Sequence, residues 1–220
     1  MKTSITLTRQ KDAASPRREQ SYEYELREGM SLLNVLSVIS EADPTLEYSH
    51  CCDNACCGIC AVMCDGVPGL SCRIKARADM RVSPLKNLPA ARDLVIDRDA
   101  YDARRQSLSL YSSHAGAENE PIAALDPALQ EPVKTASRCI ECLCCLAVCP
   151  IYAKESERFA GPCDFVLIAR HALDPRDETD RSAQIERMNA RLCVGCSRCS
   201  EVCPSQADPA RMIRLLMKTP

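Results

Sequence analysis

Hydrophobic and polar residues alternate in two segments near the N-terminus. Residues 3–8 and 20–27 both follow the two-residue period of a strand that is buried on one face. A polar, proline-containing segment separates them, so the pattern predicts a hairpin. Short runs at 61–63 and 94–97 predict two further strands.

A helical period follows the predicted hairpin. Apolar residues recur at helical spacing after Ser31, which can cap the helix, and the turn residues Asp43 and Pro44 are expected to follow its end. One helix packed on a small sheet predicts an α+β module, which we assign to residues 1–103.

The pattern changes after Asp99, where helical periodicity replaces the strand period. Helices are predicted at 99–112, 162–173, 181–191 and 208–218. No convincing strand remains, so the second module, residues 104–220, is predicted to be all-α. The segment 116–132 is rich in alanine, proline and acidic residues and is predicted to be a surface loop.

Charge and length exclude several classes of partner. The 220 residues carry 28 Lys and Arg against 30 Asp and Glu, so no basic field indicates nucleic acid or an anionic lipid surface. No stretch approaches the roughly 20 consecutive apolar residues of a membrane span, and the N-terminus has no signal-peptide pattern. We expect a cytoplasmic chain that meets a membrane only through a partner.

The cysteine content points to a class of chemistry. The chain has 17 Cys, no Trp and two Phe, a composition typical of a disulfide-rich secreted protein or of a metal protein. The missing export signal favours metal. A disulfide framework and zinc ribbons are the less favoured alternatives.

The first cysteine group has the spacing of a plant-type two-iron, two-sulfide cluster. Cys52, Cys57 and Cys60 stand in the pattern C-x4-C-x2-C, with Cys72 further on. Gly58 has no side chain, so we expect it to let a backbone N–H approach a cluster sulfur. These four cysteines are the predicted ligands of a 2Fe-2S cluster.

Two further groups repeat the bacterial ferredoxin pattern C-x2-C-x2-C-x3-C-P. In two-cluster ferredoxins the fourth cysteine of each run ligates the other cluster. The predicted ligands of the first 4Fe-4S cluster are Cys139, Cys142, Cys145 and Cys203. The predicted ligands of the second are Cys193, Cys196, Cys199 and Cys149.

Five cysteines stay outside these sets. They are Cys51, Cys56, Cys64, Cys144 and Cys163. Cys51 and Cys56 are also separated by four residues, but only the choice of Cys52, Cys57 and Cys60 satisfies both spacings. We expect the five to be small buried hydrophobic residues near a cluster.

Beyond the cysteines, several segments resemble the iron-sulfur subunits of succinate dehydrogenase and fumarate reductase. The matching segments are CGIC at 57–60, DGVPGLSC at 65–72, SPLKNLPAARDLVID at 83–97, CIECLCCLAVCP at 139–150, FAGP at 159–162 and DPRD at 174–177. The resemblance covers nearly the whole chain. It implies a plant-type ferredoxin (β-grasp) domain followed by a helical two-cluster ferredoxin domain.

The resemblance also implies a function. In this family the subunit relays electrons between the FAD of a catalytic flavoprotein subunit and a quinone at a membrane anchor. It therefore implies an FAD-containing partner, a membrane-anchor or acceptor subunit, and a position on the cytoplasmic face of the inner membrane through those partners.

Two places depart from the usual family pattern. The family commonly has another residue at the position matching Cys196, which gives a three-iron cluster; the cysteine here implies a four-iron cluster, with 3Fe-4S as the alternative. Quinone-reducing members usually have Trp after the matching Cys-Pro, and many have His where this chain has Val194. Here Ile151 and Tyr152 follow, and Tyr152 is the candidate to contact a quinone.

No catalytic residues are predicted, because the sequence contains no FAD-binding glycine motif, phosphate loop or nucleophile–base pair. The first hypothesis is the relay subunit of a succinate dehydrogenase or fumarate reductase. The second is the same relay serving another flavoenzyme, for a different organic acid or with a thiol or heterodisulfide partner. The third is a free-standing ferredoxin or redox sensor with responsive thiols.

Overall fold

The computed structural model describes residues 1–112 and 127–218. By its internal contacts the chain forms two compact units. The first comprises residues 1–99 and 140–148, and the second residues 100–139 and 149–220. Segment 140–148 thus belongs to the first unit although it lies far along the sequence, a feature absent from the predicted division at residue 103.

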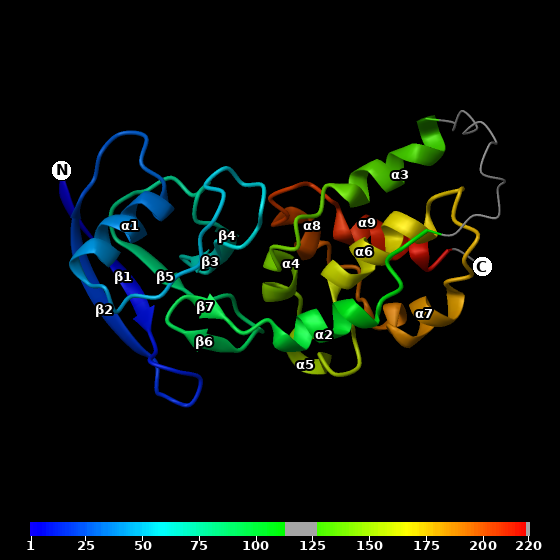
Figure 1. Ribbon diagram of the computed structural model, residues 1–220, viewed down its shortest axis with the longest axis horizontal. Coiled ribbons are helices and arrows are strands. Elements are labelled where there is room, and N and C mark those ends of the chain that lie inside the picture. The colour runs from blue at the N-terminus through cyan, green and yellow to red at the C-terminus, as the bar shows by residue number, and fades with distance from the viewer. Residues whose placement is uncertain (113–126, 219–220) are drawn as a thin grey trace. The chain divides into compact units, whose positions relative to one another are not determined.

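A five-stranded sheet in the order β2-β1-β5-β3-β4 forms the frame of the first unit (Figure 1). Its strands are β1 (Lys2–Arg9), β2 (Arg18–Glu25), β3 (Ala61–Cys64), β4 (Val67–Leu70) and β5 (Met80–Ser83). β1 and β2 pair antiparallel along their whole length, which confirms the predicted hairpin, whereas β1 and β5 run parallel. The run predicted at 94–97 forms β7 (Val95–Ile96), which pairs with β6 (Ala90–Arg92) in a separate small sheet.

Helix α1 (Leu32–Ala42) packs its apolar face on this sheet. Ser31 caps it as predicted: the Ser31 hydroxyl accepts the N–H of Asn34, and the Asn34 side chain accepts the N–H of Ser31. Such a cap stabilises a helix by about 1 kcal/mol. Leu32 and Leu36 are buried against Ile5 and the rest of the core, and each fully buried leucine contributes roughly 1.5–3 kcal/mol.

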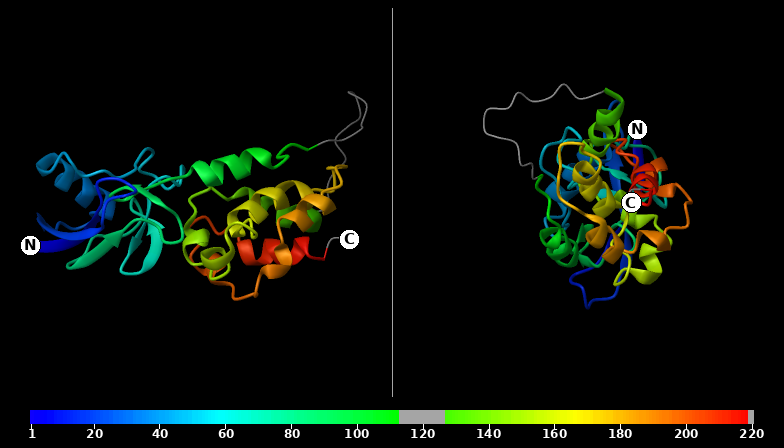
Figure 2. Two further views of the ribbon diagram at one scale, coloured as in Figure 1. Left: turned by 90° about the horizontal axis from the view of Figure 1, so that it is seen from below. Right: turned by 90° about the vertical axis from the view of Figure 1, so that its right-hand side faces the viewer.

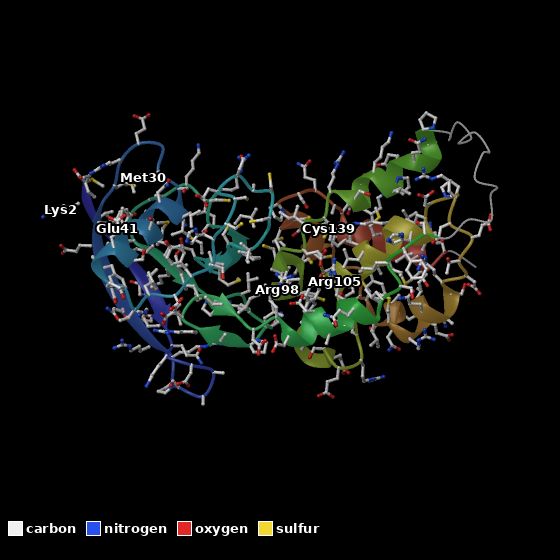
Figure 3. All side chains as sticks on the ribbon, viewed as in Figure 1. Lys2, Met30, Glu41, Arg98, Arg105 and Cys139 are labelled. Atoms are coloured by element: carbon white, nitrogen blue, oxygen red, sulfur yellow. The ribbon has the colours of Figure 1, made fainter. Side chains whose placement is uncertain are left out.

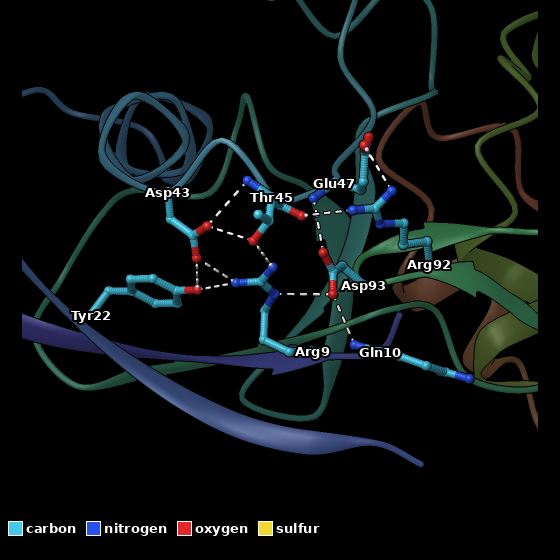
Figure 4. Close-up of polar contacts among 8 residues, drawn as sticks. All are labelled: Arg9, Gln10, Tyr22, Asp43, Thr45, Glu47, Arg92 and Asp93. Carbon is cyan, nitrogen blue, oxygen red and sulfur yellow. Dashed lines mark hydrogen bonds and ion pairs between the residues drawn. The ribbon is translucent and has the colours of Figure 1, made fainter. Parts of the chain in front are cut away.

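A buried polar network closes one end of this sheet (Figure 4). The Arg9 guanidinium on β1 donates to Asp93 at 3.0 Å, to Asp43 at 2.7 Å and to Thr45 at 2.9 Å. It also donates to the Tyr22 hydroxyl. Burial alone lowers the pKa of Arg9, but hydrogen bonds to Asp93 and Asp43 raise it above its ordinary value, so the guanidinium stays charged.

The described part of the second unit is helical, and the predicted α+β fold with a helical second domain is confirmed. Its elements are α2 (Asp99–Ser107), α3 (Pro127–Ser137), α5 (Tyr152–Glu155), α6 (Pro162–Ala172), α7 (Ser182–Arg187), the 3-10 turn η1 (Ala190–Leu192), α8 (Arg198–Glu201) and α9 (Pro209–Leu216). The core helix is α6, which is buried from Pro162 to Ala169 and packs against α3 and α9 (Figure 2).

The prediction of a surface loop at 116–132 is wrong for the part that the structure describes. Residues 127–132 belong to α3, and the remainder, up to residue 126, lies outside the described residues. Pro132 explains the error: proline lacks an N–H and usually ends a helix, yet here α3 continues through it to Ser137.

Within residues 1–112 and 127–218, no helix is long and apolar enough to cross a membrane.

Candidate iron–sulfur centres

The predicted 2Fe-2S ligands form two close pairs in the first unit. Cys52 and Cys57 lie in the irregular loop between α1 and β3, Cys60 immediately precedes β3, and Cys72 follows β4. The Cys60 and Cys72 sulfurs are 3.5 Å apart, and the N–H of Cys57 donates to the Cys52 sulfur at 3.3 Å.

The backbone of this loop is arranged around the Cys52 sulfur. The N–H groups of Asn54 and Cys56 also donate to it, at 3.4 and 3.3 Å. These backbone hydrogen bonds, that of Asn54 first, lower the pKa of Cys52 to about 7. Backbone donors that converge on a thiolate are the environment of an iron–sulfur ligand, so the residues fit the cluster.

The pKa of Cys72 is shifted in the opposite direction from that of Cys52. Burial, followed by the hydrogen bond from Cys60, raises the pKa of Cys72 to about 11. Four thiolates close together repel one another, and a cluster whose iron atoms carry positive charge removes that cost.

The predicted ligands of the second 4Fe-4S cluster line one small pocket in the second unit. Cys149 comes shortly after α4 (Cys144–Ala147), Cys193 and Cys196 lie in the loop after η1, and Cys199 lies in α8. The rest of the lining is mostly apolar and includes Phe159. Cys196 is therefore placed with the other three cysteines, as a fourth ligand requires.

The electrostatics of this pocket also fit a bound cluster. Burial, followed by the charges of Cys149, Cys193 and Cys196, raises the pKa of Cys199 to about 12. Burial likewise raises the pKa of Cys149. The N–H of Tyr152 donates to the Cys149 sulfur at 3.4 Å, as a ligand thiolate would require.

The predicted ligands of the first 4Fe-4S cluster are divided between the units. Cys142 and Cys145 lie in segment 140–148 of the first unit, where Cys145 is part of α4 (Cys144–Ala147). Cys139 and Cys203 belong to the second unit. There the N–H of Ala207 donates to the Cys203 sulfur at 3.3 Å.

Within residues 1–112 and 127–218, no three His, Cys, Asp or Glu side chains are arranged to hold a single metal ion. A cluster distributes its cysteine ligands over several iron atoms, so its thiolates stand further apart than those around one ion.

Gly58 makes a contact that its sequence context did not reveal. A side-chain Cβ at Gly58 would lie 2.4 Å from the carbonyl oxygen of Ile140 and 3.0 Å from the Cβ of Cys142. The missing side chain thus admits segment 140–148. The predicted approach of an N–H to a cluster sulfur stays a prediction.

Tyr152 lies inside the second unit. Only 5 % of its surface is exposed, and its hydroxyl accepts a hydrogen bond from Arg104 at 3.3 Å. Arg104 in turn forms an ion pair with the fully buried Asp164 at 2.9 Å. This geometry favours packing next to Cys149 over contact with a quinone.

The five remaining cysteines divide into two groups. Cys64, Cys144 and Cys163 are buried, as predicted. The same prediction is wrong for Cys51 and Cys56, which are exposed because the loop that carries them lies outside the apolar core.

Two domain families match the chain. Residues 4–103 match a 2Fe-2S iron-sulfur cluster binding domain, and residues 135–207 match a 4Fe-4S dicluster domain. The fold and the sites thus define an iron–sulfur protein with a ferredoxin-type sheet domain and a helical dicluster domain.

Similar proteins assign the chain to one family within this class of iron–sulfur proteins. The fumarate reductase iron-sulfur subunit of Escherichia coli O157:H7 is 33 % identical, with 84 % of this chain and 78 % of that protein covered. That of Haemophilus influenzae is 31 % identical, with 83 % and 78 % covered. The chain belongs to the family of succinate dehydrogenase and fumarate reductase iron–sulfur subunits.

Archaeal relatives and one solved structure complete the comparison. One subunit of the fumarate reductase (CoM/CoB) of Methanothermobacter marburgensis is 31 % identical over 86 % of this chain, and an uncharacterised iron–sulfur protein of Methanocaldococcus jannaschii is 34 % identical over 84 %. The chain spans only 38 % and 37 % of their lengths. A chain of the Mycobacterium smegmatis Sdh1 complex in the apo form shares the fold, with a TM-score of 0.87, 22 % identity, and 99 % of this chain and 94 % of that chain covered.

Proposed function

We propose that this chain is the electron relay of a succinate dehydrogenase- or fumarate reductase-type complex, with one 2Fe-2S and two 4Fe-4S clusters. The observation that carries the proposal is the pocket in which Cys196 joins Cys149, Cys193 and Cys199. Four thiolates there favour a four-iron over a three-iron cluster.

The chain's own residues hold and tune the centres. When bound, iron–sulfur clusters accept and donate single electrons. The backbone N–H groups around Cys52 stabilise thiolate charge, and the mostly apolar lining of the second pocket keeps Cys199 buried. Hydrogen bonds to sulfur and solvent exclusion are both determinants of cluster potential, so the two environments separate the potentials of the centres.

The relay requires partners. We propose an FAD-containing catalytic subunit that exchanges electrons with the 2Fe-2S centre, and a membrane-anchor or acceptor subunit that exchanges them with the Cys193–Cys199 centre. The complex would be cytoplasmic, and peripheral on the inner membrane where an anchor is present. Identifying the flavoprotein that co-purifies with this chain tests the assignment, and purification as a monomer with no partner would contradict it.

A second candidate is a relay that serves a thiol-linked fumarate reductase. It is supported by the similarity to the archaeal CoM/CoB-type enzyme and by Cys196 and Val194 at positions where quinone-linked members commonly differ. The buried hydroxyl of Tyr152 supports the same candidate, because it is already bonded to Arg104. Reduction of the purified complex by a dithiol, compared with a quinol, discriminates the two.

Iron analysis of anaerobically purified protein tests the cluster inventory. Three centres of these types hold about ten iron atoms per chain. Cys196→Ser should lower the iron content by one and produce the oxidised-state paramagnetic signal of a three-iron centre. The same content in both proteins would remove Cys196 from the ligand set.

Adjacent cysteines offer a matched control for the two-iron set. Cys57→Ser should abolish the 2Fe-2S spectrum, whereas Cys56→Ser should leave it intact, because Cys56 is exposed and outside the spacing. The reverse result would favour the Cys51 and Cys56 register.

A further inference from the structure

Glycine at position 58 is not explained by backbone conformation alone. Its φ of +72° lies in the left-handed region, where glycine has no steric penalty. However, Asp53 and Ala55 in the same loop adopt φ values of 53° and 55° with side chains present. A positive φ is therefore tolerated in this loop without glycine.

The close approach of another backbone segment explains the glycine at position 58 better. A Cβ at Gly58 would lie 2.4 Å from the Ile140 carbonyl oxygen and within 3.1 Å of two Cys142 carbon atoms, and real Cβ atoms essentially never come as close as the first. Glycine is the residue that permits such a close approach of a backbone. The backbone next to Cys57, a proposed 2Fe-2S ligand, thus lies directly against Cys142, a proposed 4Fe-4S ligand.

Two side chains of the same unit hold segment 140–148 in this position. The Asn87 amide donates to the carbonyl oxygens of Leu146 and Ala147 at 2.9 and 3.1 Å. Arg98, labelled in Figure 3, donates to the Glu141 carbonyl oxygen at 3.3 Å. Asn87 itself has a φ of +63°. Asparagine adopts this left-handed conformation readily, so the turn presents the Asn87 amide to the segment at little cost.

We propose that the contact of Gly58 with Ile140 and Cys142 is the junction through which an electron passes between the 2Fe-2S and the first 4Fe-4S centre. Gly58 is a positioning residue: by having no side chain it brings the two ligand segments together. The step moves one electron, so that one centre is oxidised as the other is reduced, and no bond or proton changes. The inference rests on the proposed relay function and assigns the place where the relay passes between two centres.

The contact matters because electron transfer slows exponentially as the gap between donor and acceptor widens. A methyl group at position 58 must move from 2.4 Å to the ordinary contact range, which begins at 3.4 Å. The ligand segments must therefore separate by a large part of that difference, and the transfer should slow severalfold.

The test compares Gly58→Ala with Gly66→Ala in the full, anaerobically purified chain, together with any partner that purifies with it. Gly66 has a φ of +83°, and a Cβ there would meet nothing within 4 Å. Both variants therefore bear a similar conformational cost of alanine at positive φ. Only Gly58→Ala pushes segment 140–148 away.

The measurement is the rate at which an electron placed on the 2Fe-2S centre appears on the 4Fe-4S centre, followed by flash photoreduction and rapid-freeze EPR. We expect severalfold slower transfer in Gly58→Ala with both spectra and both potentials retained, and an unchanged rate in Gly66→Ala. Equal rates in the two variants, with the centres intact, would overturn the proposal.

A second measurement decides the matter if Gly58→Ala does not retain both centres. In the fully reduced unaltered protein, two centres joined by this contact should show mutual magnetic broadening of their EPR spectra. Separate, non-interacting spectra would overturn the junction. A protein without iron would instead defeat the relay function itself, so the two failures are distinguishable.

Discussion

Replacing Asp93 by asparagine removes the charge at the centre of the network in Figure 4 while keeping the side chain's shape. Asp93 is 2 % exposed. One carboxylate oxygen accepts Arg9 Nε at 3.0 Å and the Gln10 N–H at 2.8 Å, and the other accepts the Glu47 N–H at 3.0 Å. The carboxylate thus ties strand β1 to the segment after α1 and to the β6–β7 turn.

The expected cost follows from burial. Removing one partner of a buried ion pair costs about 3–5 kcal/mol, because the other charge stays without compensation. The Asp93→Asn variant keeps one oxygen acceptor, and Arg9 keeps its pair with Asp43, so we expect the lower end, about 3 kcal/mol. At about 1.4 kcal/mol per factor of ten, opening of this region should become on the order of 100-fold more frequent.

Native-state hydrogen exchange, read by mass spectrometry, measures this opening directly. Peptides from β1 and β2 should lose protection in Asp93→Asn. Peptides from α6 in the second unit serve as the internal reference, since the substitution touches none of its contacts. The method suits this chain because it has no Trp to report unfolding and because cluster loss would complicate global denaturation.

The matched control is Glu19→Gln on β2. Glu19 pairs with Arg81 at 3.1 Å, but both side chains are more than 60 % exposed, and such pairs contribute little. Both variants replace a carboxylate by its amide, and both carboxylates bond to residues of the five-stranded sheet, Asp93 to β1 and Glu19 to β5. If Asp93→Asn lost no more protection in β1 than Glu19→Gln, the assignment of the buried network as a major stabilising element would be refuted.

Three further predictions concern the second unit and the clusters. The hydrogen bond from Arg211 lowers the pKa of Glu131 to about 2. A carboxyl group whose pKa is lowered on folding stabilises the fold above its ordinary pKa of 4.5, and this stabilisation is lost as the pH falls toward 2. The α3 amides should therefore lose exchange protection between these pH values in the native chain and show no such step in Glu131→Gln. Arg104→Met removes the arginine that pairs with the buried Asp164 carboxylate and should destabilise α6 by about 3–5 kcal/mol, measured by hydrogen exchange of α6 peptides. Tyr152→Phe removes only the hydrogen bond from Arg104 and should cost about 1 kcal/mol, so equal effects would contradict the ion-pair argument. Anaerobic iron chelation should lower the exchange protection of residues 193–203 more than that of the β1–β2 hairpin, because cysteine ligation stabilises residues 193–203 and a hydrophobic core stabilises the hairpin. An equal loss of protection in both segments would contradict this prediction.

Local patterns predicted the elements whose residues make local contacts. The β1–β2 hairpin and α1 were predicted because strand alternation, the Ser31 cap and the helical spacing all lie within short windows. Strand β3 has four consecutive buried residues and no alternation, and β5 finds its parallel partner far away in the sequence. Only tertiary packing decides such strands, so their pairing was not predictable.

The cysteine sites likewise divide into features that local spacing predicted and features that depend on contacts between distant segments. Spacing alone selected Cys60 and Cys72, whose sulfurs lie 3.5 Å apart, and the four cysteines that line the pocket with Cys199. Their role as ligands stays a prediction. The contact of Gly58 with Ile140 was invisible, because it joins segments that lie far apart in the sequence. The exposure of Cys51 and Cys56 was missed because composition suggested burial, whereas the core cluster of the first unit includes neither residue.

The return of segment 140–148 to the first unit has a consequence for protein engineering. A truncated gene that stops at residue 103 would encode the sheet domain without the backbone that fills the space beside Gly58 and accepts the two Asn87 hydrogen bonds. Such a fragment would also expose the surface beside β4 that the buried helix α4 covers in the whole chain. A stable minimal version should therefore be built as a chimera, with residues 140–148 grafted back through a short designed linker.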